Sequence, residues 1–314
     1  MASVKRRAQR AEELMADRIG FIGLGRMGKP MATRIHEAGF ALTVFDVVGE
    51  TMDTFRQRGV KTASSPREVA DNAEIVFACI PSPEASLAVA FGEDGIARGS
   101  AIEVYLECST IGPDYMAKIA DGLSKTRISF LDAPISGGIP GAEQGTLSVV
   151  TAGDAAALER ARPAMSAYAR HIFHVADKPG PAQIAKLINN MLSTTGTIAA
   201  FEGMVFGAKA GLDVEALLEF INVSTGRNVA TMQKIPANIL TRKFGGKIDT
   251  GVKDLGLFVQ QAEKFGIKPY IAPRVQEVFR DAIAGGYDKE TMRIIEFLES
   301  RAGEGVVVKG KSKA

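Results

Sequence analysis

The chain has 314 residues, 46% of them hydrophobic, and its formal net charge is +2 at pH 7. This length can form two domains with hydrophobic cores. The near balance of charges predicts neither a nucleic-acid groove nor a basic membrane-binding patch. No run of about 20 apolar residues is present, which argues against a membrane-spanning helix.

Cysteine and histidine are scarce. The two cysteines, Cys79 and Cys108, cannot form a disulfide scaffold, and the three histidines show no zinc-ligand spacing, so no metal site is expected. Residues 1–17 are basic and then acidic, and they lack the apolar core of a secretory signal. Residues 1–17 and 302–314 are predicted to be flexible ends of a cytoplasmic protein.

The first strong signal along the chain is a glycine-rich turn after an apolar run at 19–23. It reads Gly23, Leu24, Gly25, Arg26, Met27 and Gly28, and a helical stretch follows. In this spacing the first glycine permits a tight turn, the second lets a pyrophosphate approach the backbone, and the third lets helix and strand pack closely. The turn therefore predicts dinucleotide binding at a helix N-terminus.

A second predicted strand, 41–45, ends at Asp46, about 20 residues beyond the glycines. A carboxylate there can accept hydrogen bonds from the ribose hydroxyls of NAD, whereas it would repel the 2′-phosphate of NADP. The two valines that follow offer no cation for that phosphate. NAD is favoured over NADP; the alternative is that Asp46 only caps the next helix.

Short apolar runs alternate with helical stretches over residues 18–180. This alternation predicts an α/β fold, a Rossmann-type doubly wound parallel sheet. The expected strands are 19–23, 41–45, 75–80, 103–107, 128–132, 147–152 and 171–175. Ligands of such sheets bind at the carboxyl ends of the strands, which places the chemistry in the loops after them.

The pattern changes at Pro181. Residues 181–301 show no strand signal and predict an all-helical substrate and oligomerisation domain, joined to the first by one long helix. Gly196, Gly203 and Gly207 lie near one face of that helix and would allow another helix to approach closely. Because a single small domain could not cover a helix of this length, we expect a homodimer or homotetramer.

Two segments carry candidate chemistry. Ser136, Gly137 and Gly138 follow a predicted strand, and successive backbone N–H groups there would form a nest for a carboxylate; the alternative is a plain turn. Lys186 and Asn190 lie four residues apart on one face of the long helix. A lysine in a closed site can have a lowered pKa and exchange a proton, although a solvated lysine is the simpler interpretation of that pair alone.

Together these segments resemble the β-hydroxyacid dehydrogenase family, which includes 3-hydroxyisobutyrate dehydrogenases and tartronate semialdehyde reductases. The resemblance covers about residues 18–301 and rests on four motifs in order, at 20–28, 132–138, 186–190 and 253–256. It implies an NAD-dependent oxidoreductase that converts a small β-hydroxy acid to a semialdehyde or keto acid, or the reverse.

The resemblance also implies roles at matching positions. Lys186 would transfer the proton. Substrate would be held by Ser136, Gly137, Gly138 and Asn190. Pro81, Thr110 and Lys253 would line the cofactor, beside the glycine turn and Asp46.

Two positions depart from the family pattern, Ala182 in place of a glycine and Cys108 before Ser109. Both concern the pocket wall, so the particular hydroxy acid stays open. The alternatives are an imine reductase on the same scaffold, whose members usually lack the lysine, and a catalytically inactive dinucleotide-binding module.

Overall fold

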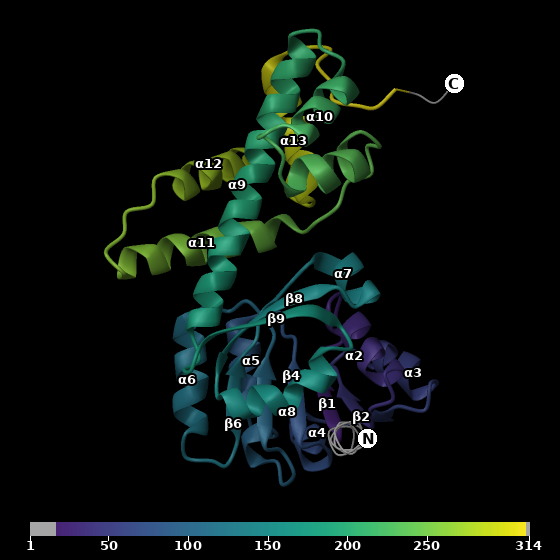
Figure 1. Cartoon of the computed structure of the whole chain (residues 1–314), viewed down its shortest axis with the longest axis vertical. Coiled ribbons are helices and arrows are strands. Elements are labelled where there is room, and N and C mark those ends of the chain that lie inside the picture. The colour runs from purple at the N-terminus through teal and green to yellow at the C-terminus, as the bar shows by residue number, and fades with distance from the viewer. Residues whose placement is uncertain (1–16, 312–314) are drawn as a thin grey trace, which may run out of the picture. The chain divides into compact units, whose positions relative to one another are not determined.

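The computed structural model describes residues 17–311 and divides into two compact units between Lys186 and Leu187. Unit 1 ends at Lys186 and unit 2 begins at Leu187, and each is described by itself (Figure 1). The sequence predicts a division slightly earlier, between 180 and 181. Helix α9 (Pro181–Lys209) begins in unit 1 and continues into unit 2.

Unit 1 is built on a mostly parallel sheet, as the sequence predicts. Its parallel strands run in the order β3-β2-β1-β4-β5-β6. They are β1 (Ile19–Ile22), β2 (Leu42–Phe45), β3 (Lys61–Thr62), β4 (Ile75–Ala78), β5 (Val104–Glu107) and β6 (Ser129–Asp132). The order reverses direction at β1, which is the arrangement of a doubly wound dinucleotide-binding sheet.

On the far side of the sheet, strands also pair antiparallel, which the sequence analysis did not predict. Strand β8 (Leu147–Gly153) is antiparallel to β6 and to the short β7 (Ile135–Ser136), whereas β9 (Ala169–Ala176) is parallel to β8. A short connection that contains the seven-residue helix α7 (Gly138–Gln144) joins β7 to β8. Antiparallel neighbours accept such a short connection, whereas parallel neighbours need a longer crossover.

Helices cover both faces of this sheet. Strand residues alternate between two hydrophobic cores: Phe21 and Phe77 contribute to one, and Ile22 and Val76 to the other. The main helices are α2 (Gly28–Glu37), α3 (Gly49–Arg56), α4 (Pro66–Asn72), α5 (Pro83–Phe91), α6 (Pro113–Leu123) and α8 (Ala155–Met165). Proline in the first turn and a side-chain cap fix the starts of α4 and α5, at Ser65 and Ser82.

Unit 2 is all-helical over the residues that the structure describes, as predicted. After α9 come α10 (Val214–Val223), the π-helical η2 (Ala230–Ile239), α11 (Ile248–Lys264), α12 (Ile271–Ala284) and α13 (Ile294–Ala302). Its core includes Phe201, Ile235 and Phe279. A Cβ at Gly207 would lie 2.3 Å from Leu217, so this glycine lets α10 approach α9, whereas Gly203 has no atom within 4 Å of such a Cβ.

The predicted flexible end from residue 302 differs from the structure. Val308 is fully buried, and the backbone N–H of Gly310 donates to the carbonyl of Leu240. The three valines at 306–308 give this segment apolar surface that it can bury against unit 2. The predicted N-terminal extension lies outside the described residues except for Asp17, whose carboxylate accepts hydrogen bonds from Arg160.

Candidate active site

The glycine turn of unit 1 has the geometry that a pyrophosphate requires. Gly23 has φ +88°, and a Cβ on it would lie 2.4 Å from the carbonyl oxygen of Cys79. A Cβ on Gly28, the first residue of α2, would lie 1.8 Å from the carbonyl oxygen of Gly23. Gly25 is different, because no atom lies within 4 Å of its Cβ position. The outer glycines therefore permit close packing, and the middle one keeps open backbone where a phosphate can approach.

Asp46 lies beside this turn. Its Oδ2 accepts a hydrogen bond of 2.6 Å from the backbone N–H of Leu24, and its Oδ1 accepts one of 2.8 Å from that of Val48. The N-cap position of α3 is Val48, so Asp46 does not occupy the capping position that the alternative requires. Asp46 thus fixes the glycine turn to the end of β2. A ribose hydroxyl would meet a carboxylate that is already oriented.

The loops that carry Pro81 and Thr110 follow β4 and β5 and are tied together. The Ser109 hydroxyl accepts a 2.6 Å hydrogen bond from the backbone N–H of Ile80. Pro81 is exposed and Thr110 is partly exposed, so both can meet a ligand. Their place at the carboxyl ends of adjacent parallel strands is where such sheets bind nucleotides.

Gln183 joins the loop after β5 to the start of α9, and the sequence analysis missed this residue. Its Oε1 accepts 3.0 Å hydrogen bonds from the backbone N–H groups of Ile111 and Gly112, and its Nε2 donates to the carbonyl of Ser109 at 3.0 Å. The side chain is fully buried. No sequence pattern marked Gln183, because its burial and its partners appear only in the folded structure.

Asp132 completes this buried network at the end of β6. It accepts hydrogen bonds from the backbone N–H groups of Gly180 and Gln183, at 3.0 and 3.1 Å, and from Gln183 Nε2 at 2.7 Å. Burial raises the pKa of Asp132 to about 7, although these hydrogen bonds favour the ionised carboxylate. Asp132 and Gln183 therefore hold the first turn of α9 on the sheet, immediately before Lys186.

The turn at Ser136, Gly137 and Gly138 has the backbone expected of an anion nest. Ser136 ends β7, and the two glycines have φ values of +129° and +66°. Both glycines are exposed, and Gly138 begins α7. A turn of two left-handed residues at a helix start exposes successive N–H groups. A carboxylate ligand at this turn stays a prediction, because a plain turn can have the same backbone.

Lys186 is buried in unit 1, with 8% of its surface exposed. This burial differs from the solvated lysine that the simpler interpretation requires. In unit 2, Asn190 Nδ2 donates a 2.7 Å hydrogen bond to Asp254 Oδ2, and Lys253 Nζ lies 3.4 Å from Asp254 Oδ1. Asp254, which the sequence analysis did not single out, thus holds both Asn190 and Lys253.

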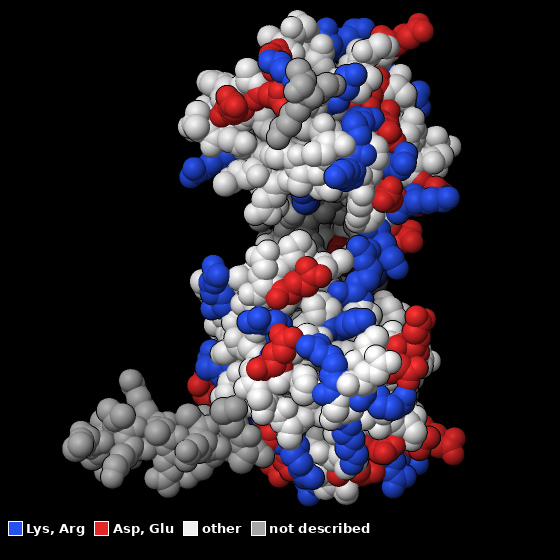
Figure 2. Space-filling model, turned by 90° about the vertical axis from the view of Figure 1, so that its right-hand side faces the viewer, with Lys and Arg blue, Asp and Glu red and all other residues white. Residues whose placement is uncertain are grey.

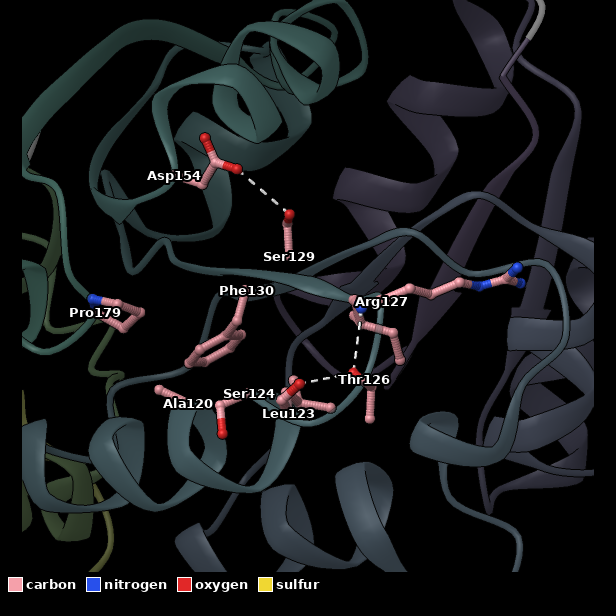
Figure 3. A pocket seen from close by; sticks show the side chains of 10 residues that line it. Ala120, Leu123, Ser124, Thr126, Arg127, Ser129, Phe130, Asp154 and Pro179 are labelled. Carbon is pink, nitrogen blue, oxygen red and sulfur yellow. Dashed lines mark hydrogen bonds between the residues drawn. The ribbon is translucent and has the colours of Figure 1, made fainter.

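A separate pocket in unit 1 lies at the opposite end of β6, around Ser129 and Phe130 (Figure 3). Two hydrogen bonds join residues of its lining: the Ser129 hydroxyl donates to Asp154 at 3.4 Å, and the backbone N–H of Ile128 donates to the Thr126 hydroxyl. None of the expected site residues lines it. It therefore contributes no part of the candidate active site.

Two further properties concern residues 17–311 alone. No three acidic, cysteine or histidine side chains in this range are arranged to hold a metal ion. None of the described helices combines the length and apolarity of a membrane span. On the face drawn in Figure 2, basic and acidic side chains are interspersed over unit 1.

Two known families match successive parts of the chain. Residues 18–176 match the family described as the NAD binding domain of 6-phosphogluconate dehydrogenase. Residues 180–298 match the family described as NAD-binding of NADP-dependent 3-hydroxyisobutyrate dehydrogenase.

Individual relatives cover nearly the whole chain. It is 35% identical to an NAD-dependent L-serine dehydrogenase of Pseudomonas aeruginosa, over 89% of this chain and 97% of that protein. It is 34% identical to a 3-hydroxyisobutyrate dehydrogenase of the same organism, over 78% and 85%. A solved structure of Mycobacterium tuberculosis 3-hydroxyisobutyrate dehydrogenase with L-serine superposes with a TM-score of 0.80 at 27% identity, over 90% and 99%. The chain belongs to the β-hydroxyacid dehydrogenase family.

Proposed function

We propose that Lys186 exchanges the hydroxyl proton in the NAD-dependent oxidation of a small β-hydroxy acid, or in the reverse reduction. The enzyme is an oxidoreductase of hydroxy acids that uses NAD. The observation that carries the proposed role is the burial of Lys186 immediately after the turn that Asp132 and Gln183 fix to the sheet. A buried lysine at a fixed place is suited to general acid–base work.

Each remaining group has a proposed part. The nest at Ser136, Gly137 and Gly138 binds the substrate carboxylate, and Asn190 holds the substrate hydroxyl. The glycine turn and Asp46 would hold NAD, which would supply the hydride acceptor for the carbinol carbon. Pro81, Thr110 and Lys253 line the cofactor. Lys186 takes the hydroxyl proton as the carbonyl forms, so charge does not accumulate on the oxygen.

The test is a screen of small β-hydroxy acids for NADH formation, with the matching α-hydroxy acids as controls. The proposal predicts turnover of at least one β-hydroxy acid and loss of that turnover in Lys186→Ala. Reduction of cyclic imines without oxidation of any hydroxy acid would favour the imine reductase alternative. Tight NAD binding with no turnover of either class would favour the inactive module.

We also propose that the chain forms a homodimer or homotetramer. Unit 2 exposes large apolar side chains, including Phe206 at 74%, Phe220 at 65% and Leu192 at 62%. Side chains of this size are commonly covered in interfaces. Light scattering that gave the monomer mass at micromolar concentration would contradict the proposed assembly.

We also propose a cytoplasmic location. The two cysteines are free, as is usual for proteins of a reducing compartment.

A further inference from the structure

Lys234 of unit 2 is a partly buried cation that the proposed reaction does not use. Its Nζ donates hydrogen bonds to the hydroxyls of Thr197 at 2.8 Å and Ser193 at 3.4 Å. Both partners are neutral, and the part of the chain that the structure describes gives Lys234 no carboxylate partner. Burial lowers the pKa of Lys234. A charge removed from water without a counter-ion is costly.

The partners of Lys234 lie on the same face of α9 as Asn190, which is proposed to hold the substrate. Asn190, Ser193 and Thr197 follow one another at intervals of three and four residues, which brings side chains to one helical face. Lys186 precedes Asn190 by four residues in the same series. Between Asn190 and Ser193 the helix rises about 4.5 Å. A short carbon chain can bridge that distance.

The segment that carries Lys234 is fixed against this face within unit 2. Asn228 lies two residues before η2, and its Oδ1 accepts hydrogen bonds from the backbone N–H groups of Ala230 and Thr231 at 2.7 and 3.2 Å. Its Nδ2 donates to the carbonyl of Gly196 at 3.5 Å, and a Cβ on Gly196 would touch Asn228 at 3.6 Å. The start of η2 therefore packs on α9, one turn before Lys234.

We infer that Lys234 is a specificity-determining residue that binds a second carboxylate of the substrate. The preferred substrate would then be a β-hydroxy acid with a second acidic group at the end of a short carbon chain. This inference rests on the proposed function, in which Asn190 on the same face of α9 holds the substrate hydroxyl. The second carboxylate supplies the counter-charge that Ser193 and Thr197 do not.

A matched pair of substrates tests this on the whole enzyme. 2-(Hydroxymethyl)glutarate carries the second carboxylate, and 2-(hydroxymethyl)pentanoate lacks it. We expect the wild-type enzyme to favour the diacid in kcat/KM by roughly tenfold or more, mainly through KM, since the added contact joins two charged groups. Lys234→Gln keeps the hydrogen bonding to the hydroxyls but removes the charge, so it should lose this preference. Lys234→Arg should retain most of it.

Controls separate this from a structural role. Lys289→Gln removes an exposed lysine of the same unit and should change neither substrate's kinetics. If the role of Lys234 were purely structural, Lys234→Gln would change kcat/KM equally for the diacid and the monoacid, and that outcome would overturn the inference. A wild-type enzyme that showed no preference for the diacid would also overturn it. If the variant folds poorly, calorimetric binding of glutarate against butyrate to the wild-type enzyme measures the same discrimination. Turnover of the monoacid alone would leave the proposed function standing, whereas absence of all turnover would count against that function.

Discussion

Gln183→Leu should destabilise the enzyme more than any ordinary surface change. The substitution leaves three buried backbone groups without their partner, namely the N–H groups of Ile111 and Gly112 and the carbonyl of Ser109. It also removes the donor that lies 2.7 Å from Asp132 Oδ1. An unsatisfied buried polar group costs about 1–3 kcal/mol, and neighbouring losses do not simply add, so we expect a loss of roughly 3–6 kcal/mol. The free energy of unfolding of a natural domain is only about 5–15 kcal/mol, so such a loss would be a large part of the total.

The assay is urea unfolding followed by circular dichroism, with Gln57→Leu as the control because Gln57 is exposed in the same unit. The control should unfold within about 0.5 kcal/mol of wild type. In the folded fraction, Gln183→Leu should also lower kcat, since the turn before Lys186 loses its attachment to the 109–112 loop. A loss of stability below about 1 kcal/mol for Gln183→Leu would refute the reasoning that this network holds the site.

Three further outcomes are expected. Asp46→Ala should raise KM for NAD and narrow the preference for NAD over NADP in kcat/KM, because the carboxylate that holds Leu24 of the glycine turn and would repel a 2′-phosphate is removed; an unchanged ratio would contradict this. The pKa of Asp132 rises from 3.8 to about 7 on folding, so its contribution to the free energy of unfolding should fall as pH rises across that range. Asp132→Asn should reduce the dependence of the free energy of unfolding on pH in this range, measured by urea unfolding. An equal slope in the wild type and the variant would exclude this contribution of Asp132. Cys79 should resist iodoacetamide at pH 8 until urea is added, because burial raises its thiol pKa to about 12; rapid labelling of the folded enzyme, read by mass spectrometry, would be the contrary result.

The sequence was sufficient for the fold class and the glycine turn because both depend on local pattern. Alternation of apolar runs predicts the parallel strands. The spacing of the glycines predicts the turn, in which Gly23 and Gly28 leave no room for a side chain. It was not sufficient for β3 and β7, since two-residue strands leave no periodic signal. Strand β8 itself was predicted, but its antiparallel direction was not, because strand direction depends on how short connections close, which alternation alone does not encode.

The candidate site divides in the same way. Ser136, Lys186 and Asn190 were found because they stand in motifs, and their roles remain predictions. Gln183 and Asp132 act through contacts between residues far apart in the chain, so only the fold reveals them. Buried polar side chains must find partners, but a sequence does not say which ones.

The contacts of Asp254 with Asn190 and of Lys234 with Thr197 also join separate helices of unit 2. No spacing rule along one helix could have predicted these pairs. The same limit applies to Val308, whose burial depends on the surface that unit 2 offers it.

The most direct test of the account is the turnover of Lys186→Ala on the best β-hydroxy acid from the screen. If Lys186 transfers the proton, kcat should fall by roughly 10²–10⁴, the usual contribution of general acid–base catalysis. Affinity for NAD should stay near wild type, because the glycine turn and Asp46 are untouched. Lys186→Arg should be nearly as impaired, since a guanidinium does not give up its proton. A Lys186→Ala enzyme that folds and keeps a near-normal kcat would contradict the proposed mechanism.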